Sequence, residues 1–154
     1  MLDAAGHRYG RVLDLYAGSG ALAIEALSRG AAEADLVESD RRACEAAREN
    51  LRALGLEGRG RVWCVEVVRA AESLRGAYDT VFLDPPYVQG TPERAWDWLA
   101  RGDVVAAWGR IVLEHSPRVV LPSRCGDLAL ERTRRYGDTC ISIYGGAAAD
   151  EEEA

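Results

Sequence analysis

The sequence predicts an α/β fold in which a doubly wound, mostly parallel sheet ends in an antiparallel hairpin. Apolar runs alternate with helical patterns along most of the chain, which is typical of βαβ units. Two glycines separate the first apolar run from a helix, as they do in nucleotide-binding sheets. Near the end, two alternating stretches flank the tight turn Tyr136-Gly137-Asp138, which predicts a hairpin.

The first half of the chain alternates strands and helices. In chain order we predict a strand over 11–16, a helix over 19–29, a strand that ends at 35–38, a helix over 41–54 and a strand over 61–68. Gly30 and Gly55 follow the two helices, and glycine is favoured just after a helix. Asp40 precedes the second helix, where its carboxylate can cap the first turn. The apolar stripe of this helix is predicted to be Ala43, Ala47, Leu51 and Leu54.

The second half of the chain completes the sheet. In chain order we predict a helical turn over 70–74, a strand over 78–83, a helix over 92–99 with an extension to 107 left open, a strand over 110–115, and hairpin strands over 128–135 and 139–144. A chain of 154 residues buries roughly 70% of its unfolded surface in a single core. We therefore expect a single domain over 1–149 and an acidic tail over 150–154.

Composition excludes several classes of protein. The four cysteines form no CxxC pair and there are two histidines, so neither a disulfide framework nor a metal site is predicted. No run approaches the roughly 18 apolar residues that span a bilayer, so we expect a cytoplasmic protein without membrane contact. The net charge is −6, but the acidic tail supplies four of these charges. Charge therefore neither supports nor excludes a nucleic-acid partner.

A glycine-rich turn, Gly18-Ser19-Gly20, follows the first predicted strand. Glycines there let the backbone approach a ligand closely and leave helix-start N–H groups facing it. A tight turn without a ligand is the alternative. A relaxed dinucleotide pattern is also present, because Ala23 completes Gly18-x-Gly20-x-x-Ala23. Asp14 favours a different ligand, since a carboxylate in the strand suits a cationic amino-acid group, such as that of S-adenosylmethionine, better than a pyrophosphate.

Glu38 ends the second predicted strand, 18 residues after Gly20. That distance matches the acid that accepts hydrogen bonds from ribose hydroxyls in nucleoside-binding sheets. A surface acid without a ligand is the alternative. Together with the glycine turn, Glu38 predicts a nucleoside site at this edge of the sheet.

The segment Asp84-Pro85-Pro86-Tyr87 follows the fourth predicted strand, at the edge where ligands of open α/β sheets bind. Prolines stiffen the backbone and leave their carbonyls as acceptors. A carboxylate and a carbonyl can each accept one N–H of an exocyclic amino group and hold its nitrogen toward a methyl donor. Tyr87 offers an aromatic face to a base turned out of its stack. An ordinary Asp-Pro turn with a surface tyrosine is the alternative.

With these motifs the chain resembles the class I methyltransferases, and most closely the bacterial small-subunit ribosomal RNA guanine-N2 methyltransferases of the RsmD family. The glycine turn and Asp-Pro-Pro-Tyr are shared with adenine-N6 and cytosine-N4 methyltransferases. The full run at 14–31 and the run at 136–139 narrow the resemblance to the ribosomal RNA group. The resemblance extends from about Val12 to Tyr144. The matching runs are DLYAGSGALAIEALSRGA at 14–31, VESD at 37–40, FLDPPY at 82–87, IVLEH at 111–115 and YGDT at 136–139.

The resemblance implies a Rossmann-like enzyme that binds S-adenosylmethionine, releases S-adenosylhomocysteine and uses no metal. It implies ribosomal RNA within a small-subunit particle as the partner of a monomer. The residues implied to receive guanine are Asp84, Pro85, Pro86 and Tyr87. The residues implied to bind the cofactor are Asp14, Tyr16, Ala17, Gly18, Gly20, Glu38, Ser39, Ala71, Glu72 and Asp84. An adenine-N6 methyltransferase, an NAD-dependent dehydrogenase and a non-catalytic cofactor-binding remnant remain alternatives.

Two departures from the family pattern affect these expectations. Family members place Asp or Asn after the third strand to bind the adenine amino group, whereas this chain has Arg69-Ala70-Ala71-Glu72. Glu72 or a backbone carbonyl is expected to substitute. Family members also carry some tens of residues, including a basic hairpin, before the glycine turn. Here Met1 to Gly10 precede the first strand, so either the chain is truncated or its start misassigned, or it binds RNA by other means. We expect weak cofactor binding and low activity in this form.

Two further groups have alternatives that the sequence leaves open. His115, beside Glu114 at the end of a predicted strand, either borders the site or lies on the surface. Arg132, Arg134 and Arg135 on the hairpin either contact phosphate or form a solvated strand face.

Overall fold

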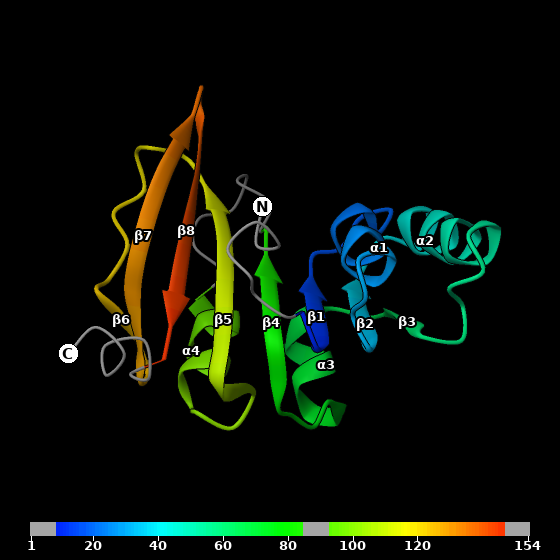
Figure 1. Ribbon diagram of the computed structural model, residues 1–154, viewed down its shortest axis with the longest axis horizontal. Coiled ribbons are helices and arrows are strands. Elements are labelled where there is room, and N and C mark those ends of the chain that lie inside the picture. The colour runs from blue at the N-terminus through cyan, green and yellow to red at the C-terminus, as the bar shows by residue number, and fades with distance from the viewer. Residues whose placement is uncertain (1–8, 85–92, 147–154) are drawn as a thin grey trace.

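The computed structural model describes residues 9–84 and 93–146 of the chain. Within these residues, strands form one sheet in the order β3-β2-β1-β4-β5-β8-β7-β6 (Figure 1). Strands β1 to β5 pair in parallel, whereas β8 is antiparallel to both β5 and β7. The strands are β1 (Arg11–Leu15), β2 (Glu33–Glu38), β3 (Gly60–Cys64), β4 (Tyr78–Leu83), β5 (Val105–His115), β6 (Arg124–Cys125), β7 (Leu128–Tyr136) and β8 (Thr139–Gly145). The predicted sheet, mostly parallel with an antiparallel C-terminal hairpin, is confirmed.

Helices cover both faces of the sheet and bury alternate residues of its strands. They are α1 (Ala21–Ser28), α2 (Arg41–Ala53), α3 (Val67–Ser73) and α4 (Glu93–Ala100). One core joins α1 and α2 to strand residues that include Val12, Leu36, Phe82, Val112 and Ile143. The other joins α3 and α4 to strand residues that include Leu13, Val37, Val81, Ile111 and Leu113. We call the side of the sheet that carries the first core the α1/α2 face.

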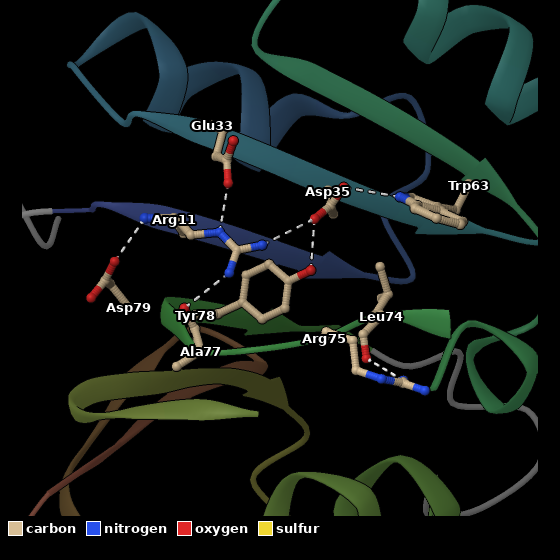
Figure 2. A network of polar contacts seen from close by, with 9 residues as sticks. All are labelled: Arg11, Glu33, Asp35, Trp63, Leu74, Arg75, Ala77, Tyr78 and Asp79. Atoms are coloured by element: carbon tan, nitrogen blue, oxygen red, sulfur yellow. Dashed lines mark hydrogen bonds and ion pairs between the residues drawn. The ribbon is translucent and has the colours of Figure 1, made fainter. Parts of the chain in front are cut away.

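A polar network ties the parallel strands β1, β2, β3 and β4 together (Figure 2). The backbone N–H of Arg11 in β1 donates to Asp79 of β4 at 2.8 Å. Asp35 of β2 accepts hydrogen bonds from Trp63 of β3 at 2.9 Å and from Tyr78 of β4 at 2.6 Å. Because the partners come from β1, β2, β3 and β4, the network fixes the register of these four strands. Their carboxyl ends are thereby held in a set arrangement.

Strand β3 is shorter than predicted. It ends at Cys64, and Val67 and Val68, expected at the end of the strand, lie in the first turn of α3. Valine favours strands, but that preference depends strongly on what the side chain packs against. Here Val67 is 6% exposed and packs from the helix into the core on the α3 side. Tertiary packing therefore overrides local preference at this point.

Other boundaries also differ from the prediction. Strand β5 begins at Val105 rather than Arg110, and α4 ends at Ala100, so the helix extension to 107 does not form. Strand β6 was not predicted; its two residues are too few to produce an alternating pattern. Leu54 was expected on the apolar stripe of α2 but is 60% exposed, because it follows the last helical residue, Ala53.

The position of β8 distinguishes this sheet from a dinucleotide-binding one. In the latter, the order 3-2-1-4-5-6 continues with a parallel strand beyond β5. Here β8, from the C-terminal hairpin, occupies that position and runs antiparallel to β5. The order still reverses between β1 and β4, and ligands of open α/β sheets bind at such a reversal, at the carboxyl ends of the strands.

Candidate functional site

The carboxyl ends of β1, β2, β4 and β5 meet at one edge of the sheet. Leu15 of β1 pairs with Val37 of β2 and with Leu83 of β4, and Leu83 pairs with Leu113 of β5. The residues that follow these four positions are therefore neighbours. They are the glycine turn after β1, Glu38, Asp84 and Glu114.

The turn after β1 contains three residues in the left-handed region of backbone conformation. The φ angles are 62° at Tyr16, 60° at Gly18 and 90° at Gly20. The N–H of Ala17 donates to the carbonyl of Val37 at 3.0 Å, and the N–H of Gly20 donates to the carbonyl of Ala17 at 2.9 Å. A non-glycine residue in this region costs about 1–3 kcal/mol and persists only when its surroundings enforce it. Tyr16 is therefore a strained residue next to the candidate site.

The two glycines of the turn have different roles. A Cβ atom at Gly20 would lie 2.9 Å from Cδ2 of Leu36, so Gly20 permits close packing of the start of α1 against β2. A Cβ atom at Gly18 would meet none of the described atoms within 4 Å. The space beside the Gly18 backbone is thus open, as close approach of a ligand requires.

Glu38 links the glycine turn to the second strand. Its Oε1 accepts a hydrogen bond from the N–H of Gly18 at 2.9 Å, and its Oε2 accepts one from the N–H of Asp40 at 2.8 Å. Asp40 caps α2 as predicted, because its side chain accepts from the N–H of Ala43 at 2.9 Å. The half-buried Glu38 carboxylate has about four lone-pair positions, so it can also accept hydrogen bonds from ligand hydroxyls. Ser39, the next residue, is exposed.

Asp14 is a buried carboxyl group beneath the turn, 1% exposed. Its Oδ2 accepts a hydrogen bond from the N–H of Ala23 in α1 at 3.2 Å. Burial raises the pKa of Asp14 to about 7; the hydrogen bond opposes this shift, while the charges of Asp84 and Glu38 add to it. Asp14 therefore supports the start of α1 and acts on the site through its charge rather than through an exposed carboxylate.

Asp84 and Glu114 form a pair of carboxyl groups at the ends of β4 and β5. The preceding residues, Leu83 and Leu113, pair directly, which places the two acids next to each other. Burial raises the pKa of Asp84 to about 6, and the charge of Glu114 and a hydrogen bond with its side chain contribute. Glu114 was not among the predicted site residues. Its place at the carboxyl end of the strand beside β4 is the signal that would have found it.

The electrostatics of this edge favour a cation. Asp14, Glu38, Asp84 and Glu114 all contribute negative charge, and the raised pKa values of Asp14 and Asp84 reflect burial together with mutual repulsion. A bound cation would relieve that repulsion. S-adenosylmethionine has a sulfonium and an ammonium group, and its ribose hydroxyls can donate to Glu38. These residues therefore fit that cofactor, whereas a dinucleotide pyrophosphate would add further negative charge.

The start of α3 lies beyond the end of β3, where a contact with the cofactor's adenine is expected. Ala71 is half-buried and Glu72 is exposed, and both lie in the second half of α3. Glu66 is the N-cap residue of α3 and makes no side-chain capping hydrogen bond. Because β3 ends at Cys64, Glu66 is the first acid after the strand. The prediction missed it by extending the strand to Val68.

Four predicted candidates remain, of which the structure describes only His115. Pro85, Pro86 and Tyr87 lie outside the described residues. His115 is 6% exposed, and its Nε2 lies 2.7 Å from the hydroxyl of Ser142, so it is buried in the sheet rather than on the surface.

The sequence also led to expectations about disulfides, metal sites and membrane-spanning helices. The four cysteines are free. Over residues 9–84 and 93–146, no group of three or more metal-ligating side chains comes together. No helix in the same ranges combines the length and apolar character that crossing a bilayer requires.

Comparison with known proteins identifies the family to which the chain belongs. A family model described as conserved hypothetical protein 95 matches residues 1–145. "Ribosomal RNA small subunit methyltransferase D" of Escherichia coli (strain K12) is 32% identical over 142 residues, which are 92% of this chain and 71% of that protein. The chain belongs to the RsmD family of methyltransferases.

Further relatives agree with membership of the RsmD family. "Putative rRNA methyltransferase YlbH" of Bacillus subtilis (strain 168) is 37% identical over 138 residues, 88% of this chain and 75% of that protein. A solved structure described as "Putative methyltransferase yhhF from Escherichia coli" has a TM-score of 0.81 at 32% identity and covers 92% of this chain and 79% of that one. The fold is that of class I methyltransferases, and RsmD-family membership argues against the NAD-dependent dehydrogenase.

Proposed function

We propose that the chain transfers a methyl group from S-adenosylmethionine to the exocyclic N2 amino group of a guanine in small-subunit ribosomal RNA. The observation that carries this proposal is the convergence of the glycine turn, Glu38 and Asp84 where the strand order reverses. Ribosomal RNA as the substrate is supported by the names of two relatives. Guanine is supported by the resemblance of the motifs to guanine-N2 methyltransferases.

The cofactor is proposed to bind over the ends of β1 and β2. When bound, S-adenosylmethionine would supply a methyl group activated by its sulfonium cation, and breaking of the bond from sulfur to this methyl group would leave neutral S-adenosylhomocysteine. Glu38 would accept the ribose hydroxyls with the lone pairs that Gly18 and Asp40 leave available. The open space at Gly18 admits the ligand, and Asp14 adds negative potential for the ammonium group. The other proposed members of this binding set are Tyr16, Ala17, Gly20, Ser39 and Asp84.

The adenine contact is proposed to come from the start of α3. An exocyclic amino group donates hydrogen bonds, and the exposed Glu66 carboxylate is an acceptor that no capping bond occupies. Ala71 and Glu72, implied by the resemblance, lie further along the helix. Replacing Glu66 by Ala should weaken binding of S-adenosylhomocysteine more than Glu72→Ala does. A larger effect of Glu72→Ala would assign the adenine contact to Glu72, as the resemblance implies.

The acceptor base is proposed to be held by Asp84. A carboxylate oxygen that accepts one N–H of the amino group orients the nitrogen lone pair and counters the positive charge that develops on this nitrogen. The sequence assigns the second N–H to the carbonyl of Pro85 and base stacking to Tyr87, with Pro86 stiffening the segment. Once the N–C bond has formed, the nitrogen loses a proton to Asp84. Glu114 shares this proton before it reaches solvent.

One experiment tests the acceptor and its context together. Undermethylated small subunits, and the same RNA freed of protein, are incubated with S-adenosylmethionine labelled in its methyl group and then digested to nucleosides. Label on N2-methylguanosine from the particle is the expected result. Label on N6-methyladenosine would replace guanine by adenine, and label on neither RNA would overturn the function. Greater transfer to free RNA would contradict the particle as the substrate.

The assembly state is a separate part of the proposal. We propose that one domain over residues 1–149 acts as a monomer. Light scattering at the concentration of the assay should return the mass of one chain, and a mass twice as large would contradict this part.

A further inference from the structure

We propose that the exposed side of strand β7 is a second contact surface for the substrate RNA, on which Arg132 and Arg134 bind backbone phosphates and Tyr136 stacks on a base. This inference rests on the proposed function, because it takes RNA as the substrate. It adds a surface that lies away from the acceptor and cofactor residues described above.

Strand pairing places the two arginines on the α1/α2 face of the sheet. Arg132 pairs with Ile143 of β8, and Ile143 pairs with Val112 of β5, whose side chain packs in the core of that face. Arg134 pairs with Ile141, a residue that packs against the same core. Side chains of directly paired residues lie on one side of a sheet. Tyr136 follows Arg134 by two residues in the same strand, so it shares this side.

The same pairing places Arg134 in one row across the sheet with Asp84, the residue proposed to hold the acceptor base. Ile141 pairs with Glu114 as well as with Arg134, and Glu114 lies next to Asp84. Asp84 and Arg134 are therefore three strands apart along one row of the sheet. At about 4.8 Å between strands, the separation is about 14 Å. A nucleotide chain whose base occupies the acceptor site can reach this strand with its neighbouring phosphates.

The two arginines are available for a ligand. Residues 131–136 of β7 are exposed, and Tyr136 is 53% exposed. Within the described part of the chain, the side chains of Arg132 and Arg134 make no hydrogen bond or ion pair. The nearest acid along the strand, Glu131, lies 3.7 Å from Arg110 and is thus already paired. Among residues 9–84 and 93–146, no acidic side chain therefore pairs with these two arginines.

The charge of the rest of the chain does not favour binding of RNA near the acceptor site. The net charge is −6, and the carboxyl groups around Asp84 repel phosphate. Affinity for RNA comes largely from cationic side chains that neutralise phosphates, and aromatic side chains add stacking on unpaired bases. The hairpin of β7 and β8 also rises beyond the carboxyl ends of β4 and β1, on the side where the site lies (Figure 1). It can therefore extend the contact with RNA beyond the target nucleotide.

The test compares Arg132→Ala/Arg134→Ala with a matched double variant, Arg48→Ala/Arg52→Ala. Arg48 and Arg52 are exposed on α2, near the end of the sheet remote from β7 (Figure 1), so the two variants lose the same charge at different places. A third variant, Arg135→Ala, removes the neighbouring charge on the opposite side of β7, where Arg135 pairs with the buried Cys140. For each protein, the RNA dissociation constant at several salt concentrations, kcat, and binding of S-adenosylhomocysteine are measured.

The surface predicts one pattern. The hairpin double variant should bind RNA roughly tenfold more weakly, and its logarithmic salt dependence should become shallower by about 1.4, which corresponds to two lost contacts with a single strand. Its kcat at saturating RNA and its affinity for S-adenosylhomocysteine should stay unchanged, and the two control variants should bind RNA as wild type does.

Other patterns overturn the inference. Equal weakening in the α2 double variant would show a general effect of charge, and weakening by Arg135→Ala alone would place the RNA on the other side of the strand. An unchanged salt dependence in the hairpin variant, alongside normal methylation by wild type, would remove the surface but leave the proposed function. Wild-type protein that neither binds nor methylates RNA would remove both.

Discussion

Glu38 accepts a hydrogen bond from the backbone N–H of Gly18 at 2.9 Å. This bond joins the end of β2 to the turn that follows β1, across the line where the two strands pair. It brings a carboxylate that can bind hydroxyl groups beside the part of the backbone that a ligand can approach closely. The proposed cofactor site is thus preorganised by a contact within the protein.

Replacing Glu38 by Ala should weaken binding of S-adenosylhomocysteine. The change removes the proposed hydrogen bonds to the ribose and the observed bond from the N–H of Gly18. Hydrogen bonds to charged groups contribute about 1.5–3 kcal/mol, so calorimetric titration should show a loss of affinity of roughly 10- to 100-fold. Glu72→Ala, an exposed acid on α3, is the control and should have a smaller effect. Equal losses in the two variants would contradict the assignment of Glu38.

Gly18→Ala and Gly137→Ala form a matched pair. Both glycines have φ near +60°, and an added Cβ would meet none of the described atoms within 4 Å at either position. Each change should therefore lower the thermal unfolding midpoint similarly, through left-handed strain of about 1–2 kcal/mol. Gly18→Ala should in addition reduce affinity for S-adenosylhomocysteine about tenfold or more, because the methyl group occupies the proposed ligand space. The same affinity in both variants would mean that the space beside Gly18 is not used.

The stability of the free protein should decrease as pH rises toward neutrality. Burial raises the pKa of Asp14 from 3.8 to about 7 in the folded chain. The protonated form therefore stabilises the fold, fully below about pH 4, and this contribution is lost as pH rises through about 7. Thermal unfolding between pH 5 and 8 should show the decrease, and Asp14→Asn should reduce it. A slope unchanged by Asp14→Asn would assign the effect to other groups.

Binding of S-adenosylmethionine should have the opposite pH dependence. The cationic cofactor favours the ionised forms of Asp14 and Asp84, so binding releases protons below the pKa values of about 7 and about 6. The affinity should increase between pH 5.5 and 7.5 and then level off. Calorimetry in two buffers of different ionisation enthalpy measures the proton release directly. Proton uptake on binding would contradict the electrostatic account.

Asp84→Asn and Glu114→Gln should separate two proposed roles: Asp84 accepts the proton, and Glu114 raises the pKa of Asp84. Asp84→Asn removes the carboxylate that we propose holds the amino group, and methyl transfer should fall by roughly 10²- to 10⁴-fold. Glu114→Gln removes a charge that raises the pKa of Asp84, so the acid limb of the rate profile should move to lower pH from its wild-type position near 6. Burial remains as the larger cause of the raised pKa, so the shift is partial. An acid limb that does not move would exclude Glu114 from this role.

The sheet was largely predictable because its elements have strong local signals. The strand Tyr78–Leu83 has the predicted bounds, and Asp40 caps α2 as expected from its place before an amphipathic stretch. The hairpin was also visible, from alternation around Gly137. Parallel pairing was predicted from the βαβ pattern, whereas the insertion of β8 between β5 and β7 depends on pairings across the sheet that no local pattern encodes.

The site was only partly predictable, because contacts between segments far apart in the sequence leave no local pattern. Glu38 and Gly18 could be proposed from their spacing, but the hydrogen bond between them could not. Glu114 was missed because its importance lies in its position beside Asp84 on the neighbouring strand. Glu66 was missed because Val67 and Val68 resemble a strand locally, although they pack as the first turn of a helix. The roles of Pro85, Pro86 and Tyr87 remain predictions from sequence.

Titration of the purified chain with S-adenosylhomocysteine and, separately, with NAD tests the central claim most directly, namely that the edge formed by Gly18 and Glu38 is a cofactor site for methyl transfer. The account predicts that S-adenosylhomocysteine binds one molecule per chain, that this binding is weakened by Gly18→Ala, and that NAD gives no binding heat. Binding of NAD without binding of S-adenosylhomocysteine would contradict it.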